Sequence, residues 1–139
     1  MKKKLVILSW LVTLLLAGCV DEKSGFASGH KEDSPEWVLG TFFTLINEGK
    51  YEESLNLFKN NPVGPSKMQM QEYTEYINYI SKDKTIISVD LSHVPAEDME
   101  NAVEVTSVIW YKDGTGVSKW VIVETVDGKW QLTTRGSLF

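Results

Sequence analysis

Cysteine is almost absent from this chain of 139 residues, which contains only Cys19. A single cysteine excludes a disulfide within the chain, even in a compartment where disulfides form. The aromatic residues, 11% of the chain, indicate a packed globular domain and not a disordered stalk. We therefore expect a fold held together without covalent cross-links.

Positive charge is also scarce, because 14 lysines and arginines stand against 19 acidic residues. Three of the lysines lie at positions 2–4, so the remainder has 11 basic and 19 acidic residues and a net charge of −8. Nucleic-acid binding needs a basic face, which this composition does not provide. The same acidity argues against charge-driven binding to anionic lipid headgroups.

Recognisable catalytic and metal-binding motifs are missing as well. There is no Gly-x-Ser-x-Gly motif, nucleotide-binding loop, Cys-x-x-Cys pair or metal-ligand cluster. His30 has no partners at ligand spacing, and His93 is expected in a connection beside Pro95. Glu104 and Glu124 are predicted on one sheet face, where they are either a carboxylate pair or, as we favour, two solvated acids. We expect no metal and no cofactor.

One apolar run, Leu5 to Ala17, follows the three lysines. It is shorter than the ~20 residues that a membrane-spanning helix needs, and the pattern is typical of a secretory signal. Leu16-Ala17-Gly18-Cys19 resembles the lipobox of bacterial lipoproteins. The resemblance implies a signal peptide over residues 1–18 and fatty-acid attachment, such as palmitate, at Cys19. The alternative is an ordinary secretory signal followed by an incidental cysteine.

The remaining chain divides into two parts. Residues 19–33 are polar, lack periodicity and predict a flexible tether. Residues 34–139 form one domain of common size.

Three helices are predicted at the start of this domain. The first begins at Ser34, whose hydroxyl precedes a proline, and ends at Gly49. A shorter second helix has Tyr51, Leu55 and Phe58 on one face. A third is expected from Ser66 to about Ile80.

After residue 84 the apolar period changes from 3.6 to 2, which predicts strands. The expected strands are Thr85–Leu91, Ala102–Lys112, Val117–Thr125 and Lys129–Thr134. Glycine and aspartate in the last two connections are typical of hairpin turns. A two-residue Asp127-Gly128 turn places Val123 opposite Leu132 and Thr125 opposite Trp130.

An odd-length loop in the preceding hairpin gathers the alternating apolar residues on one face. These residues are Val103, Val105, Ile109, Tyr111, Val117, Val121 and Val123. The opposite face then carries Val108, Trp110, Trp120 and Ile122, which we interpret as a candidate interface. We expect a second copy, a partner or the C-terminal tail to cover the two indoles, because leaving both exposed to water is unusual on a monomer.

Helices followed by an antiparallel sheet indicate an α+β fold. The passage from Phe42 to Ser54, the helix opening at Pro35 and the Asp127-Gly128-Lys129-Trp130 hairpin resemble the nuclear transport factor 2-like superfamily, in particular its small bacterial lipoproteins with a domain of unknown function. The resemblance implies a cone-like roll of about three helices on about four curved strands. Candidate residues for a pocket in the cone are Trp37, Tyr73 and Tyr76. The alternative, which we favour for the tyrosines, is an ordinary core stripe.

These features predict a lipid-anchored, non-catalytic envelope protein on the extracytoplasmic side of the cell membrane or outer membrane. It is expected to bind a protein partner or a small ligand through the cone or the exposed sheet face. One alternative, implied by the resemblance, is a cone-pocket enzyme of dehydratase or isomerase type. Another is an accessory lipoprotein that dimerises through the sheet.

Overall fold

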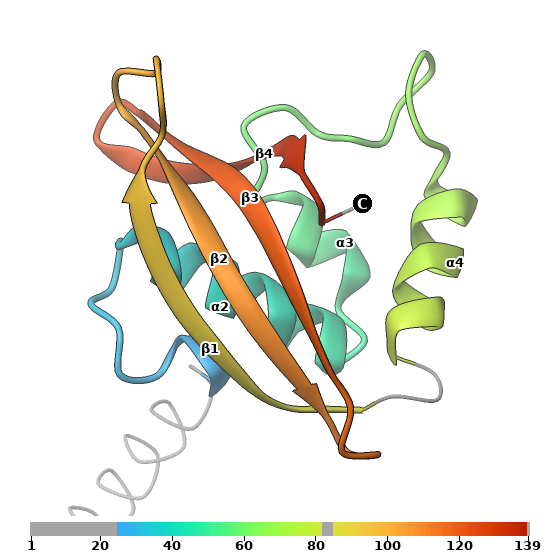
Figure 1. Cartoon of the computed structure of the whole chain (residues 1–139). Coiled ribbons are helices and arrows are strands. Elements are labelled where there is room, and N and C mark those ends of the chain that lie inside the picture. The colour runs from blue at the N-terminus through green and yellow to red at the C-terminus, as the bar shows by residue number, and fades with distance from the viewer. Residues whose placement is uncertain (1–24, 82–84, 139) are drawn as a thin grey trace, which may run out of the picture.

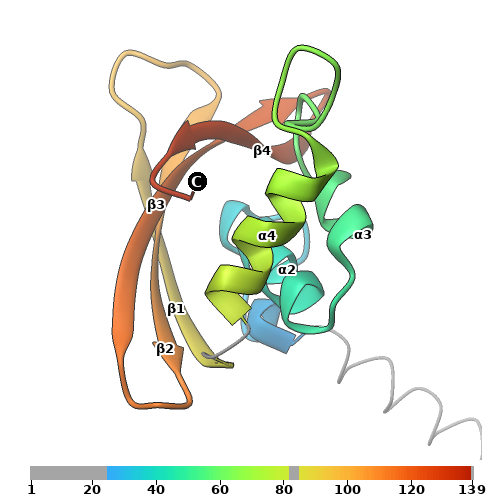
Figure 2. The same ribbon diagram turned by 90° about the vertical axis from the view of Figure 1, so that its right-hand side faces the viewer.

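The computed structural model describes residues 25–81 and 85–138 and has an α+β fold. Three α-helices pack on a four-stranded antiparallel sheet with the strand order β1-β2-β3-β4 (Figure 1). The helices are α2 (Pro35–Asn47), α3 (Tyr51–Leu55) and α4 (Met70–Ser81), and the strands are β1 (Ile86–Pro95), β2 (Ala102–Tyr111), β3 (Gly116–Val126) and β4 (Lys129–Gly136). All three helices lie on one side of the curved sheet (Figure 2). The predicted fold class is confirmed.

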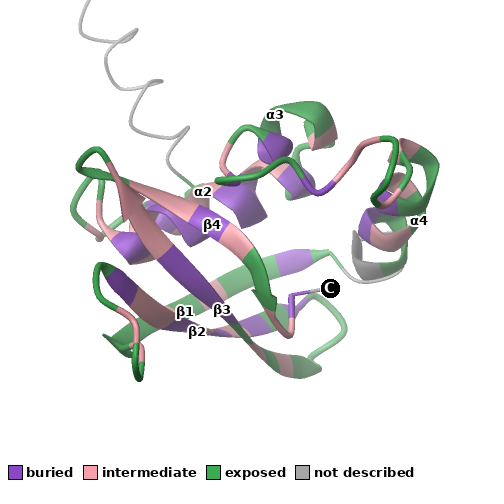
Figure 3. Cartoon of the chain, turned by 90° about the horizontal axis from the view of Figure 1, so that it is seen from above, coloured by how far each residue is buried: buried purple, intermediate pink, exposed green. Residues whose placement is uncertain are grey.

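Helix α2 is the central element of the core. It begins where the sequence predicts, because the Ser34 hydroxyl accepts a hydrogen bond of 3.2 Å from the backbone N–H of Trp37. It is followed by Gly49 at a φ of +78°, a conformation that suits glycine. Between these ends most of the helix is buried, whereas α4 and β1 carry many exposed residues (Figure 3).

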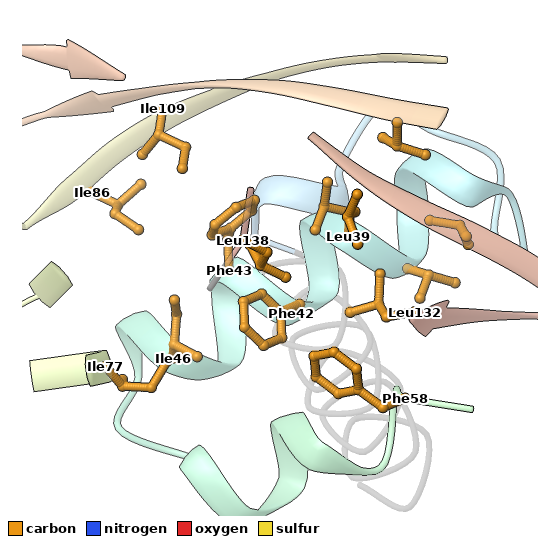
Figure 4. Close-up of a cluster of buried hydrophobic side chains, with 14 of the residues drawn as sticks. Leu39, Phe42, Phe43, Ile46, Phe58, Ile77, Ile86, Ile109, Leu132 and Leu138 are labelled. Carbon is orange, nitrogen blue, oxygen red and sulfur yellow. The ribbon is translucent and has the colours of Figure 1, made fainter. Parts of the chain in front are cut away.

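The core lies between α2 and the helix-facing side of the sheet. Phe42 packs edge-to-face on Phe58, with ring centroids 5.8 Å apart (Figure 4). Ile77 from α4 and Leu132 from β4 join the same cluster. Burying such side chains contributes about 1.5–3 kcal/mol each, and this apolar burial holds the fold together.

Residues ahead of α2 are also part of the packed fold. A short 3-10 helix, η1 (Gly25–Ala27), lies against α2, where the Phe26 N–H donates to the Thr44 hydroxyl at 2.9 Å. Ala27 is 1% exposed, and it approaches Gly40 so closely that a Cβ on that glycine would lie 2.8 Å from the Cα of Ala27. The segment predicted as a flexible tether, residues 19–33, thus contains a short helix at residues 25–27 that packs on α2.

The second and third helices differ from the predictions at their ends. Helix α3 stops at Leu55, and Phe58 instead forms a bridge beside Leu132. Helix α4 begins at Met70 and not at Ser66. The Glu72 carboxylate accepts a 3.0 Å hydrogen bond from the Gln69 N–H. Glu72 therefore stabilises the start of α4, three residues after Gln69.

The sheet has the predicted register. Val123 lies opposite Leu132 and Thr125 opposite Trp130, while Val105 pairs with Val121. Asp127 and Gly128 both have positive φ, at 52° and 77°, as a tight hairpin requires.

Strand β3 is one residue longer than predicted at each end, and two other strands continue further beyond their predicted C-terminal ends. Strand β1 continues to Pro95, so His93 lies within the sheet and not in a connection. Strand β4 continues to Gly136 through an irregularity in which three residues of β4, 133–135, lie opposite a single residue of β3, Ile122. Neither extension has an alternating apolar pattern, which is why the sequence did not predict it.

Candidate functional site

The side of the sheet that faces away from the helices, called here the outer face, carries the predicted interface residues. Val105, Ile109, Val121 and Val123 are at most 1% exposed and point into the core, so their neighbours along β2 and β3 project outward. Across the outer face, Val94, Glu104 and Ile122 form one row, and Ser92, Thr106 and Trp120 form the next.

The four predicted interface residues are not equivalent in the structure. Trp110 and Trp120 remain 42% and 43% exposed, whereas Ile122 is only 6% exposed and Val108 is half-buried. The two tryptophans lie on neighbouring strands but two rows apart, a separation of about 13 Å along the strands. They form two separate sites.

Trp110 belongs to the end of the β2–β3 hairpin. Its ring lies so close to Gly116 that a Cβ at that glycine would be 2.8 Å from the indole carbons. The indole N–H donates to the Asp90 carboxylate at 3.3 Å. Packing and a hydrogen bond within the domain therefore account for the orientation of Trp110.

Trp120 lines a pocket of about 300 Å³, called here the outer pocket. Strand β3 contributes Trp120 and Ile122, β2 contributes Glu104, and β4 contributes Arg135. The remaining wall is the end of β1 and the connection after it, formed by Val94, Pro95, Ala96, Glu97 and Met99. The structure thus brings Trp120 and Ile122 together with residues from all four strands.

The charged groups of the outer pocket are only partly compensated. An N–H of the Arg135 guanidinium contacts the sulfur of Met99 at 3.1 Å. Within residues 25–81 and 85–138, the Glu104 carboxylate has neither a hydrogen bond nor an ion pair, although the residue is half-buried. A half-buried carboxylate without a partner is a candidate binding group, because burial without a partner costs free energy.

The irregular end of β4 brings Arg135 into the pocket. The Thr133 hydroxyl donates to the Ile122 carbonyl at 2.7 Å and accepts from the Arg135 N–H at 3.2 Å. Gly136 then passes the backbone of β3 at a φ of +147°, where a Cβ would lie 2.7 Å from the Cα of Val121. This bulge changes the direction of the chain beside Ile122.

The C-terminal tail docks, but the part described does not bury the tryptophans. Leu138 is 2% exposed and belongs to the core cluster on the helix-facing side. Ser137 ties the tail to β3, and Lys119 donates to the Ser137 carbonyl at 3.1 Å from that same side. With the tail in place, both indoles are still more than 40% exposed.

The candidate cone residues lie mainly in the core. Tyr73 is completely buried, and its hydroxyl is 2.5 Å from the Ser54 hydroxyl. Burial raises the pKa of Tyr73, and burial with the nearby Tyr111 and Tyr73 raises the pKa of Tyr76. Trp37 is half-buried on the first turn of α2 and packs against the core. These positions fit the core-stripe alternative for the tyrosines.

An acid–histidine pair that the sequence did not predict joins α2 to β1. The Glu36 carboxylate and Nδ1 of His93 are hydrogen-bonded, and they form an ion pair when the imidazole is protonated. Burial raises the pKa of the Glu36 carboxyl, but the hydrogen bond from His93, a backbone hydrogen bond and the histidine charge outweigh it, so the pKa is lowered. Nothing in either local sequence indicates this contact, because the two residues are far apart in the chain.

The second predicted acid of the outer face is already occupied. Glu124 forms an ion pair of 2.7 Å with Lys59, so it does not pair with Glu104.

The described residues contain no group of three or more histidine, cysteine or acidic side chains able to hold a metal ion. Over the same ranges, no helix is long and apolar enough to span a membrane. Residues 1–24, with the predicted signal peptide and Cys19, lie outside the described part.

Comparison of the sequence with protein-family models finds no match, and comparison with curated proteins also finds none. The resemblance to the nuclear transport factor 2-like superfamily therefore stays a prediction.

Sequence reasoning found Trp120, Ile122 and Glu104 but missed the rest of the outer pocket. Arg135 was missed because the bulge is not visible as a pattern. Val94 and Pro95 were missed because β1 was expected to end at Leu91. The sequence signal available there was the apolar Val94 directly before Pro95, beyond the expected strand end. In the structure Val94 is 56% exposed.

Proposed function

We propose that this chain is a lipid-anchored protein of the bacterial cell envelope that binds a protein partner through the outer pocket. Its domain would act without catalysis, on the extracytoplasmic side of the membrane. The observation that carries the proposal is Trp120, which is 43% exposed at the edge of a pocket above the apolar Ile122. Interfaces are enriched in tryptophan at such positions.

The composition of the outer pocket supports a protein partner. Its lining combines apolar and aromatic side chains with the charged side chains of Glu97, Glu104 and Arg135. Protein interfaces also combine apolar and aromatic contacts with polar groups, and tryptophan and arginine are enriched in them. A small ligand bound in the same pocket is the alternative for this site.

A second candidate function is acid–base catalysis, favoured by the Glu36–His93 pair. The Glu36 side chain is only 12% exposed, and a histidine held by a carboxylate is a common catalytic arrangement. The test is substitution of either residue once an activity is found.

A dimerising accessory role is tested by sedimentation of the chain with Trp110→Ser and Trp120→Ser, which should shift toward the monomer if a second copy covers this face.

The membrane anchor is tested by labelling cells with radioactive or clickable palmitate. The wild-type protein should incorporate label, and Cys19→Ala should remain an unlabelled, uncleaved or mislocalised precursor. Equal labelling of the variant would contradict the anchor at Cys19.

Partner binding is tested by photo-cross-linking in intact envelopes. A photoreactive benzophenone amino acid, which keeps an aromatic ring in the pocket, replaces Trp120, and the matched control replaces Tyr79, which is 85% exposed on α4. We expect one discrete heteromeric product from position 120 and none from position 79. A product with the mass of two copies would instead support the accessory role, and no product from position 120 would contradict partner binding.

A further inference from the structure

We propose that the outer pocket receives a lysine or arginine side chain of the protein partner, an inference that rests on the proposed function. Glu104 supplies the carboxylate, Trp120 supplies an aromatic wall, and Ile122 supplies the apolar floor. The partner is thereby defined by chemistry as a protein with an exposed basic anchor residue.

Glu104 is the central group of this site. It lies between Val94 and Ile122 in one cross-strand row, so apolar side chains flank its carboxylate on both neighbouring strands. Among the described residues it has no hydrogen bond or ion pair. A cationic group entering the pocket would provide the missing partner and form a charge-assisted hydrogen bond.

Trp120 favours a cation for a second, independent reason. It lies on the strand next to Glu104, one row further along, and lines the same pocket. The negative face of an indole attracts ammonium and guanidinium groups, and its area covers the methylene stem of a lysine or arginine. A carboxylate together with an indole therefore selects a long basic side chain over a neutral or acidic one.

Arg135 has a different role in the same pocket. One guanidinium N–H of Arg135 donates to the sulfur of Met99. The other guanidinium N–H groups can donate to the partner. We assign these donors to backbone carbonyl oxygens beside the partner's basic residue. Glu97 adds a second carboxylate, so the pocket contains two acids and one base.

The net charge of the chain outside the pocket also favours a basic partner. The chain after the three lysines at positions 2–4 carries a net charge of −8. A net negative field raises the association rate of a positively charged partner and lowers that of an acidic one.

The test is an NMR titration of the full-length protein in detergent micelles at fixed ionic strength. The probe is the peptide acetyl-Gly-Arg-Gly-amide, and the matched probe replaces arginine with citrulline, which has nearly the same shape but no charge. We expect saturable shifts of the Trp120 indole N–H with the arginine peptide and much weaker binding of the citrulline peptide. Glu104→Gln should weaken arginine binding about three- to fivefold, the effect of one partly exposed charge contact. Glu53→Gln, an exposed acid on α3, should leave it unchanged.

Equal binding of both peptides, shifts spread over all acidic surfaces, or an equal effect of the two glutamine variants would overturn the inference. The cross-linking experiment separates this failure from failure of the proposed function. If a partner is captured at position 120 and Glu104→Gln leaves the yield unchanged, the binding function stands and the basic anchor residue is ruled out. If the arginine peptide binds but no partner is captured, the pocket's preference for a basic side chain stands and the proposed partner binding is ruled out.

Discussion

The backbone N–H of Trp120 donates a 2.8 Å hydrogen bond to the Ser137 hydroxyl, and the Ser137 N–H donates to the Trp120 carbonyl at 2.8 Å. These two bonds fix the chain end to the strand that carries the outer pocket. They also direct the next residue, Leu138, into the core, where it is 2% exposed. The tail therefore supports the position of Trp120 from behind and leaves its outer surface accessible.

Leu138→Ala should lower the free energy of unfolding by about 2–4 kcal/mol, because it leaves a cavity in the core. Chemical denaturation measures this change. Ile87→Ala removes a side chain that is 59% exposed on β1 and should change stability by less than about 0.5 kcal/mol. Equal effects of the two substitutions would show that the tail is not part of the core.

Gly136→Ala should destabilise the domain by about 2–4 kcal/mol, since its Cβ would overlap the Trp120 carbonyl and its φ of +147° disfavours other residues. Gly128→Ala is the matched control, because Gly128 also has a positive φ but nothing lies near its Cβ position. That control should cost about 1 kcal/mol. Thermal unfolding of both variants gives the comparison, and a tolerated alanine at 136 would contradict the described bulge.

Gly40→Ala tests whether η1 is packed on α2. In an exposed helix this change stabilises by about 0.5–1 kcal/mol. Here the new methyl group would meet Phe26 and Ala27, so we expect a net loss of about 1–3 kcal/mol in the unfolding free energy. A gain in stability would show that residues 25–27 do not pack as described.

Glu36→Gln should reduce stability by about 1 kcal/mol near neutral pH, by removing the charge-assisted hydrogen bond between the Glu36 carboxylate and His93. Because the pKa of Glu36 is lowered from its ordinary 4.5, its ionised form stabilises the fold above that pH. This contribution is lost as the pH falls through the lowered pKa of the folded state. The wild-type and variant unfolding free energies should therefore converge in acid. Glu52→Gln, another acid in a first helical turn, is the control. A Glu36 difference that persists unchanged into acid would contradict the ion pair.

The fold class and the sheet register were predictable because both depend on short-range patterns. Alternating valines in β2 and β3 fix which face is buried, and the Asp127-Gly128 turn fixes the pairing of β3 with β4. The start of α2 was predictable for the same reason, since Ser34 and Pro35 act on the adjacent backbone.

The start of α4 was predicted incorrectly because two local signals compete. The Ser66 hydroxyl after Pro65 resembles a helix start, but residues 63–68 close a turn in which the Gly64 N–H donates to the Met68 carbonyl at 3.2 Å. Glu72 then caps the later start.

The site was only partly predictable because its parts meet through tertiary structure. Alternation identified Trp120 and Ile122, but Arg135 reaches them through a bulge, and Met99 through a polar connection. The Glu36–His93 pair depends on the packing of α2 against β1, which no spacing in the sequence encodes.

Hydroxyl-radical footprinting of Trp120 shows whether a partner covers the outer pocket in the cell envelope. Oxidation of this indole is compared between the purified protein and the protein in intact envelopes, with Tyr79 as an internal reference because it is 85% exposed on another element. If a partner covers the outer pocket, oxidation of Trp120 falls several-fold in envelopes while oxidation of Tyr79 stays the same. Equal oxidation of Trp120 in both preparations would contradict partner binding at the outer pocket.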